Sequence, residues 1–125
     1  MITHKRILLV DDEPVILDEL AELMDILGYD ALCAHNVDQA LQTVEEDPDI
    51  TLIVTDMRMP GRDGVELVRE LSARSDRDFE FVVISGHFDS DDEMAGLSRL
   101  PVRRLRKPVN FEEIESLLEG LTFSS

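Results

Sequence analysis

The stretch Ile7-Leu8-Leu9-Val10-Asp11-Asp12 joins an uninterrupted apolar run to a pair of carboxylates. Two more apolar runs lie further along the chain, Leu52-Ile53-Val54 and Phe81-Val82-Val83-Ile84. Runs that are continuous, rather than alternating with polar residues, are typical of strands that are covered on both faces of a parallel sheet. Weaker strands are expected over residues 31–35 and 102–106. The sequence therefore predicts a buried parallel sheet of five strands.

Between these runs, apolar residues recur at helical spacing. The pattern i, i+4, i+7, i+8, i+11 is followed by Ile16, Leu20, Leu23, Met24 and Leu27. Pro14 stands where this helix should begin and Gly28 where it should end. Further helices are expected over residues 37–46, 63–74, 89–97 and 111–121, the fourth being weakly specified because it contains Gly96. Strands and helices thus alternate five times, which predicts an α/β fold, a doubly wound (βα)₅ parallel sheet.

Length and charge limit the classes of protein that fit this chain. The 125 residues suit a single domain, residues 1–125, with no output domain in this chain. A formal net charge of −16 argues against direct binding of nucleic acid, because phosphate groups would be repelled. Five of the 12 basic residues lie between Arg99 and Lys107, so this stripe is either a docking face or a set of solvated side chains.

Compartment and covalent chemistry follow from what the sequence lacks. No apolar run approaches the roughly 18 residues of a membrane span, and we expect no membrane partner. No signal peptide is visible before the first strand. The single cysteine, Cys33, excludes an internal disulfide and a zinc cluster of thiolates, so a cytoplasmic setting is expected. Because Cys33 falls in a predicted strand, we expect it in the core.

Polar residues stand at the ends of the predicted strands: Asp11-Asp12, Asp56, Ser85 and Lys107. Parallel strands deliver such residues to one edge of the sheet, where ligands of α/β proteins bind. Two unit charges 4 Å apart repel by about 4 kcal/mol at an effective dielectric near 20, so clustered carboxylates need a cation or raised pKa values. Oxygen ligands and phosphate suit Mg²⁺.

A lysine and a hydroxyl beside these carboxylates would complete a site for a phosphoryl group next to a carboxylate nucleophile. Taken singly, each residue also has an ordinary structural role. An aspartate at a strand end commonly caps a helix, Ser85 can be a turn residue, and Lys107 can be a solvated surface residue. The joint arrangement favours the phosphoryl site.

Four segments resemble the response-regulator receiver domains of two-component signalling. They are Ile7-Leu8-Leu9-Val10-Asp11-Asp12-Glu13-Pro14, Asp56-Met57-Arg58-Met59-Pro60-Gly61-Arg62-Asp63-Gly64, Val83-Ile84-Ser85-Gly86 and Lys107-Pro108. The resemblance covers nearly the whole chain, and the Asp-x-x-Met-Pro-x-x-Asp-Gly stretch is highly specific. It implies the flavodoxin-like strand order and a phosphoryl-accepting switch rather than an enzyme, with only self-phosphotransfer and autodephosphorylation as its own chemistry.

The resemblance assigns roles to the metal and acceptor residues. Asp56 would take the phosphoryl group from a phosphohistidine on a histidine kinase or a histidine phosphotransfer protein. Asp12, Asp56 and the backbone carbonyl of Arg58 would bind Mg²⁺ directly, while Asp11 would act through water.

It likewise assigns roles to the residues around the phosphoryl group and to the output surface. Ser85 would donate a hydrogen bond to the phosphoryl oxygens, and Lys107, preceding a cis-proline bond, would pair with them. Output to a downstream protein target would use the face of residues 89–97, 102–106 and 111–121, which could also form a homodimer. Residues 86–104 are expected to change most on phosphorylation.

The sequence departs from the family pattern around its last strand. The family usually carries Tyr or Phe three residues before the lysine, where this chain has Arg104, and Phe after Lys-Pro, where it has Val109. Leu100-Pro101 replaces the usual Gly-Ala. One hypothesis is that Arg104 responds to the phosphoryl charge or to an acidic partner surface; the alternative is that it is merely exposed. Arg58 would overhang the site and influence hydrolysis of the acyl phosphate.

Two other functions share part of this pattern. A Mg²⁺-dependent small-molecule phosphatase of the haloacid-dehalogenase type would carry a second Asp two residues after the nucleophile, where this chain has Arg58, and would need a capping insert. A receiver-like scaffold that binds partners without phosphorylation would not require all five site residues, which are present here.

Overall fold

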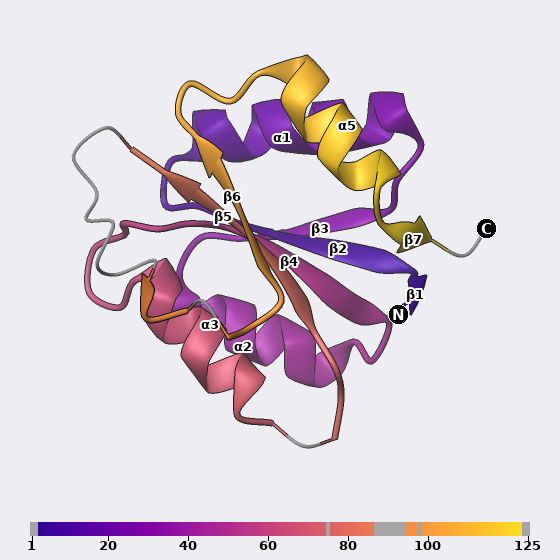
Figure 1. Ribbon diagram of the computed structural model, residues 1–125. Coiled ribbons are helices and arrows are strands. Elements are labelled where there is room, and N and C mark those ends of the chain that lie inside the picture. Colours follow the sequence, from indigo (N-terminus) through magenta and orange to yellow (C-terminus); the bar gives the residue numbers. More distant parts are fainter. Residues whose placement is uncertain (1–2, 75, 87–94, 98, 124–125) are drawn as a thin grey trace.

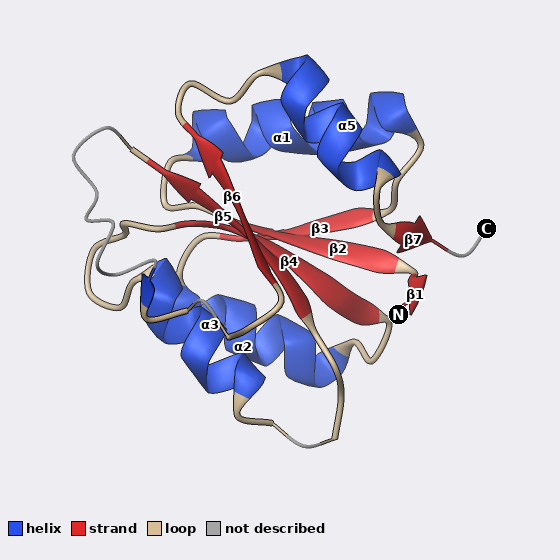
Figure 2. Cartoon of the chain, viewed as in Figure 1, coloured by secondary structure: helices blue, strands red, loops and turns tan. Residues whose placement is uncertain are grey.

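The computed structural model describes residues 3–74, 76–86, 95–97 and 99–123. Strands and helices alternate along most of the chain (Figure 2). The strands are β1 (Thr3–His4), β2 (Arg6–Val10), β3 (Ala31–Ala34), β4 (Ile50–Asp56), β5 (Glu80–Ser85), β6 (Val102–Arg106) and β7 (Thr122–Phe123). The helices are α1 (Pro14–Leu27), α2 (Val37–Glu46), α3 (Gly64–Ser72) and α5 (Phe111–Glu119).

The main sheet has five parallel strands in the order β3-β2-β4-β5-β6. Helices α1 and α5 cover one face, and α2 and α3 cover the other (Figure 1). Strand β3 lies on one side of β2, and the next strand along the chain, β4, lies on the other side of β2. The direction in which strands are added to the sheet therefore reverses between β2 and β4. The predicted doubly wound, flavodoxin-like α/β fold is confirmed, and its switch point lies at the carboxyl ends of β2 and β4.

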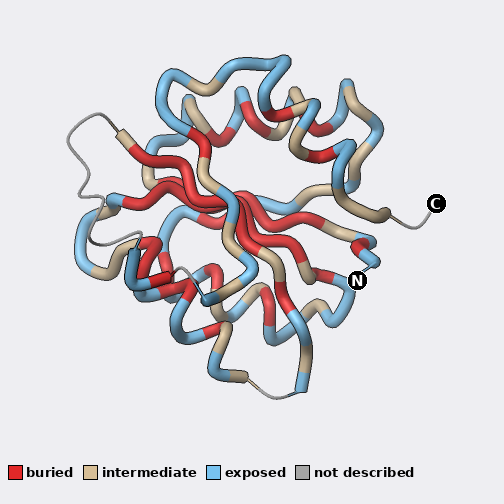
Figure 3. The backbone as a smooth tube through the Cα atoms, viewed as in Figure 1, coloured by how far each residue is buried: buried red, intermediate tan, exposed pale blue. Residues whose placement is uncertain are grey.

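Two apolar layers hold this sheet between its helices, and buried residues follow the strands (Figure 3). Successive side chains of a strand point to opposite faces, so Leu8 and Val10 pack in the layer of α2 and α3, whereas Ile7 and Leu9 pack with α1 and α5. All four are at most 1% exposed. Because both faces are buried, the strands read as continuous apolar runs.

The helix boundaries follow the predicted signals closely. Helix α1 begins at Pro14 and ends before Gly28, whose φ of 85° lies in the left-handed region that glycine adopts readily. Helix α3 is shorter than the expected 63–74, because Asp63 lies outside it as the N-cap. Helix α5 ends at Glu119 rather than 121. The expected helix over residues 89–97 falls mostly on 87–94, outside the described residues.

Two features at the periphery differ from what the sequence predicts. Cys33 is exposed, not in the core, because β3 is an edge strand whose two central residues face solvent. Strands β1 and β7 form a separate parallel pair that brings the two ends of the described chain together (Figure 1). Within this pair, buried His4 of β1 shares hydrogen bonds with Thr51 and Glu80, each at 2.8 Å. Within the described ranges, no helix has the length and apolar character that crossing a membrane requires.

The start of α3 lies directly against the end of β4. The Gly64 amide donates to the Met57 carbonyl at 3.0 Å, and Asp63 caps the helix by accepting from the Glu66 amide at 2.9 Å. A Cβ atom at Gly64 would lie 2.2 Å from the backbone oxygen of Asp56. Glycine is therefore required here for close backbone approach, and this contact fixes the loop that carries Asp56.

Substituting Gly64→Ala should lower the free energy of unfolding by about 1–3 kcal/mol, because backbone atoms must shift to admit the methyl group. Urea unfolding measures this loss. The matched control is Gly120→Ala, where a Cβ would lie 3.4 Å from its nearest neighbour, the Leu117 oxygen. Equal stability of the two variants would contradict the close-approach explanation.

Candidate functional site

Backbone hydrogen bonds continue the sheet beyond the strand ends and so fix the positions of the polar side chains. The Asp11 amide donates to the backbone carbonyl of Ala34 at 3.2 Å, and the Met57 amide donates to that of Ile84 at 2.9 Å. The Lys107 amide likewise donates to the backbone carbonyl of Ser85 at 2.9 Å. The switch point and its neighbouring strands thus present their terminal residues at one edge, as the sequence predicts.

Asp11, Asp12 and Asp56 form a cluster at this edge. One carboxylate oxygen from each residue lies within 4.8 Å of the others. Register explains this, because Val10 pairs with Thr55, and the next residues along each strand are Asp11 and Asp56. Asp11 and Asp56 are only 1% and 3% exposed, while Asp12 is half-buried.

The two buried carboxylates are only partly satisfied by protein groups. Asp11 Oδ1 accepts from the Glu13 amide at 2.9 Å, whereas Asp11 Oδ2 and Asp56 Oδ1 have no hydrogen-bond partner among the residues that the structure describes. Burial raises the pKa of Asp11 to about 6, with repulsion from Asp56 adding to the effect. Burial also raises the pKa of Asp56, against the opposing attraction of Lys107. The cluster therefore favours an added positive charge.

Lys107 supplies part of that charge. Its Nζ lies 3.2 Å from Asp56 Oδ2, and the Lys107–Pro108 peptide bond is cis, as expected. Partial burial opposes ionisation of this lysine, but the attraction of Asp56 outweighs it and raises the pKa of Lys107. One ammonium group can offset at most one of the clustered carboxylates.

Ser85 and Arg104 form a second contact beside the cluster. Ser85 is fully buried at the end of β5, and its Oγ accepts a hydrogen bond from Arg104 Nε at 2.8 Å. Arg104 is half-buried, so the interpretation of Arg104 as a merely exposed residue is wrong. Arg58 is exposed in the loop after β4; its carbonyl as a metal ligand and its influence on hydrolysis stay predictions.

The donor set of the cluster suits a hard divalent cation. All the candidate ligand atoms are carboxylate oxygens, and two of the buried oxygens lack protein donors within the described residues. Mg²⁺ prefers one or two carboxylates together with waters and phosphate oxygens. Asp11, Asp12 and Asp56 therefore fit a magnesium site. Among the described residues the cluster offers only carboxylate oxygens, whereas structural zinc sites are built from cysteine and histidine.

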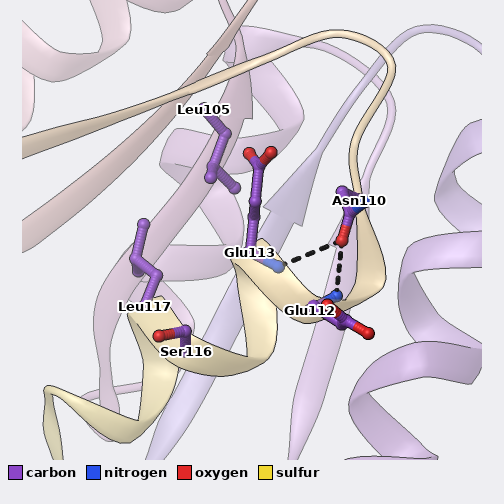
Figure 4. A pocket seen from close by; sticks show the side chains of 6 residues that line it. All are labelled: Leu105, Asn110, Glu112, Glu113, Ser116 and Leu117. Carbon is purple, nitrogen blue, oxygen red and sulfur yellow. Dashed lines mark hydrogen bonds between the residues drawn. The ribbon is translucent and has the colours of Figure 1, made fainter.

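A separate hollow lies on the surface over β6 and the first turns of α5 (Figure 4). Asn110 caps this helix by accepting from the amides of Glu112 and Glu113 at 2.8 and 3.3 Å. The hollow is lined by Leu105, Asn110, Glu112, Glu113, Ser116 and Leu117. It contains no member of the carboxylate cluster.

Comparison with known proteins gives a consistent result. The family model of the response regulator receiver domain matches residues 7–119. Over 120 residues the chain is 37% identical to the transcriptional regulatory protein AruR of Pseudomonas aeruginosa, covering 93% of this chain and 48% of AruR. The chain spans about half the length of the curated relatives it matches.

Solved structures share the fold closely. A response regulator receiver protein from Pseudomonas putida superimposes with a TM-score of 0.85 at 27% identity, covering 96% of this chain and 99% of that one. A receiver domain protein from Clostridium thermocellum gives a TM-score of 0.83 at 28% identity, covering 92% and 91%. Motif, fold and site geometry agree with these matches: the chain belongs to the response regulator receiver domain family, the regulatory domains of two-component systems.

Proposed function

We propose that this chain is a signalling switch in which Asp56 accepts a phosphoryl group from a phosphohistidine on a histidine kinase or a histidine phosphotransfer protein. The observation that carries the proposal is the position of Asp56. It is a buried carboxylate with one oxygen on Lys107, while its other oxygen has no hydrogen-bond partner in the described part of the chain. That second oxygen is the nucleophile.

In the transfer step, a carboxylate oxygen of Asp56 forms a bond to phosphorus as the phosphorus–nitrogen bond of the phosphohistidine breaks. The electron pair of the broken bond stays on the imidazole nitrogen. Lys107, whose Nζ lies 3.2 Å from Asp56 Oδ2, would pair with the phosphoryl oxygens, and buried Ser85 would donate a hydrogen bond to them. These groups act by position and charge, which is the main source of catalysis in phosphoryl transfer.

Magnesium belongs to the same proposal. Asp12 and Asp56 would hold Mg²⁺ with the Arg58 carbonyl, and Asp11 would act through water. When bound, the ion would neutralise the charge that gathers on the phosphoryl oxygens and the acceptor carboxylate. Without such a cation, Asp11 and Asp56 repel the incoming phosphoryl group, because each carries a negative charge that Lys107 offsets only in part.

Output follows from the charge that phosphorylation adds. An acyl phosphate brings about one more negative charge and three acceptor oxygens to Asp56. Ser85 ends β5 and Lys107 follows β6, so a pull on either residue would act on the ends of these two paired strands. We propose that β6 and α5 contribute to the face that binds a downstream protein target or a second copy of the chain, in a cytoplasmic setting. The rest of the expected face, residues 89–97, lies mostly outside the described residues.

The first test is direct phosphorylation. Incubating the chain with acetyl phosphate and Mg²⁺ should add the mass of one phosphoryl group, measured on the intact protein, and Asp56→Asn should abolish the gain because it removes the nucleophile. The matched control is Asp63→Asn in the same loop, since asparagine retains the capping role and phosphorylation should persist. A wild-type chain that stays unmodified would favour a scaffold that works without phosphorylation.

The second test concerns the charge of the cluster. Without metal at pH 7, Asp11→Asn should raise the free energy of unfolding by about 1–3 kcal/mol, because the ionised Asp11 carboxylate is disfavoured in the folded state. The folded pKa of about 6 exceeds the unfolded value of about 4, so this penalty is complete above the folded pKa and vanishes as pH falls to about 4. Urea unfolding of the wild type and of Asp11→Asn, at pH 7 and at about pH 4, measures how the difference in unfolding free energy changes with pH.

Millimolar Mg²⁺ should stabilise the wild type more than Asp11→Asn, so the difference between their unfolding free energies should become smaller. Asp49→Asn makes the same charge change at an exposed position and serves as the control for general charge relief. If Asp11→Asn and Asp49→Asn shift the unfolding free energy equally, the crowding of the cluster has no special effect.

A further inference from the structure

Register places Arg104 and Ser85 on the same face of the sheet. Val83 pairs with Arg104 and Ser85 with Arg106, and every second residue of a strand points the same way. Arg104 therefore projects on the side that Val83 and Ser85 share, level with Val83 and two residues before Ser85 at the end of β5. From there its Nε reaches Ser85 Oγ at 2.8 Å.

The chemistry of the two groups fixes the direction of this hydrogen bond. A guanidinium group has donors and no acceptor, so the serine oxygen must accept. A hydroxyl has one proton of its own, and accepting from Arg104 leaves that proton available to donate elsewhere. A phenylalanine or an aliphatic residue at this position has no donor and could not impose that orientation. The cation also increases the acidity of the hydroxyl and its strength as a donor.

We propose that Arg104 is a positioning residue for phosphoryl binding, which holds the Ser85 hydroxyl with its proton directed to the phosphoryl group on Asp56. This inference rests on the proposed function. Ser85 is 0% exposed, so the Arg104 contact takes the place that water would fill on an accessible hydroxyl. The guanidinium adds positive charge on the far side of the serine from Asp56, while Lys107 supplies it directly at 3.2 Å.

A double-mutant cycle on the full chain tests this mechanism. The probe is beryllofluoride with Mg²⁺, a non-covalent mimic of the phosphoryl group, and affinity is measured by calorimetric titration. Arg104→Met removes the donor and the charge at similar length, and it should weaken binding about 10-fold, the scale of a charge-assisted hydrogen bond. In the Ser85→Ala background, the same substitution should change the affinity less than about twofold, because its target is gone.

Arg103→Met is the matched control. Arg103 is the preceding residue of β6, points to the opposite face and contacts Glu80 at 2.8 Å, so the variant loses the same charge without touching Ser85. Its affinity for the mimic should stay within about twofold of the wild type. Thermal unfolding of each variant reports its folding, and Arg104→Leu, which also lacks a donor and a charge, replaces Arg104→Met if that variant does not fold.

The outcomes separate the two proposals. Equal weakening by Arg104→Met in both backgrounds, or none in either, overturns the positioning role while leaving the phosphoacceptor role of Asp56 intact. A wild-type chain that takes neither beryllofluoride nor a phosphoryl group from acetyl phosphate overturns the proposed function, and the role of Arg104 with it. If the Arg104 and Ser85 substitutions act independently on the affinity while the wild type is phosphorylated normally, the positioning role is wrong and the proposed function stands.

Discussion

The repulsion between carboxylates at the end of β2 and β4 is the constraint on which the rest of the site depends. Parallel pairing places Asp11 next to Asp56, and burial denies both of them the water that would otherwise stabilise their charge. Two apolar layers hold the strands in this register, so the cluster cannot relax by spreading apart. The folded cluster therefore favours an added positive charge, and a bound cation would relieve the repulsion between its carboxylates.

Much of this arrangement can be predicted from the order of residues alone. The five strands of the main sheet are visible because both faces are buried, and each apolar run is followed by a polar residue at the edge where ligands gather. The contact of Lys107 with Asp56 follows from that convergence. Pro14 and Gly28 mark the ends of α1 because each has backbone geometry suited to a helix terminus.

Other features depend on contacts between segments that are far apart in the sequence. Cys33 looked buried because strand order, and hence which strand lies at the edge, is not encoded in a local pattern. Strands β1 and β7 have two residues each, too few to show any periodicity. The role of Gly64 depends on a contact with Asp56 of another element, and the bond from Arg104 to Ser85 is a diagonal contact that only the register of β5 and β6 reveals.

The most direct measurement of the central claim is a crystal structure of the chain with Mg²⁺ and beryllofluoride. The account predicts the mimic on a carboxylate oxygen of Asp56, within reach of Lys107 Nζ and Ser85 Oγ, with the metal ion held by the oxygens of Asp12 and Asp56. A structure in which the mimic occupies a different carboxylate, or in which the cluster binds neither group at saturating concentrations, would contradict it.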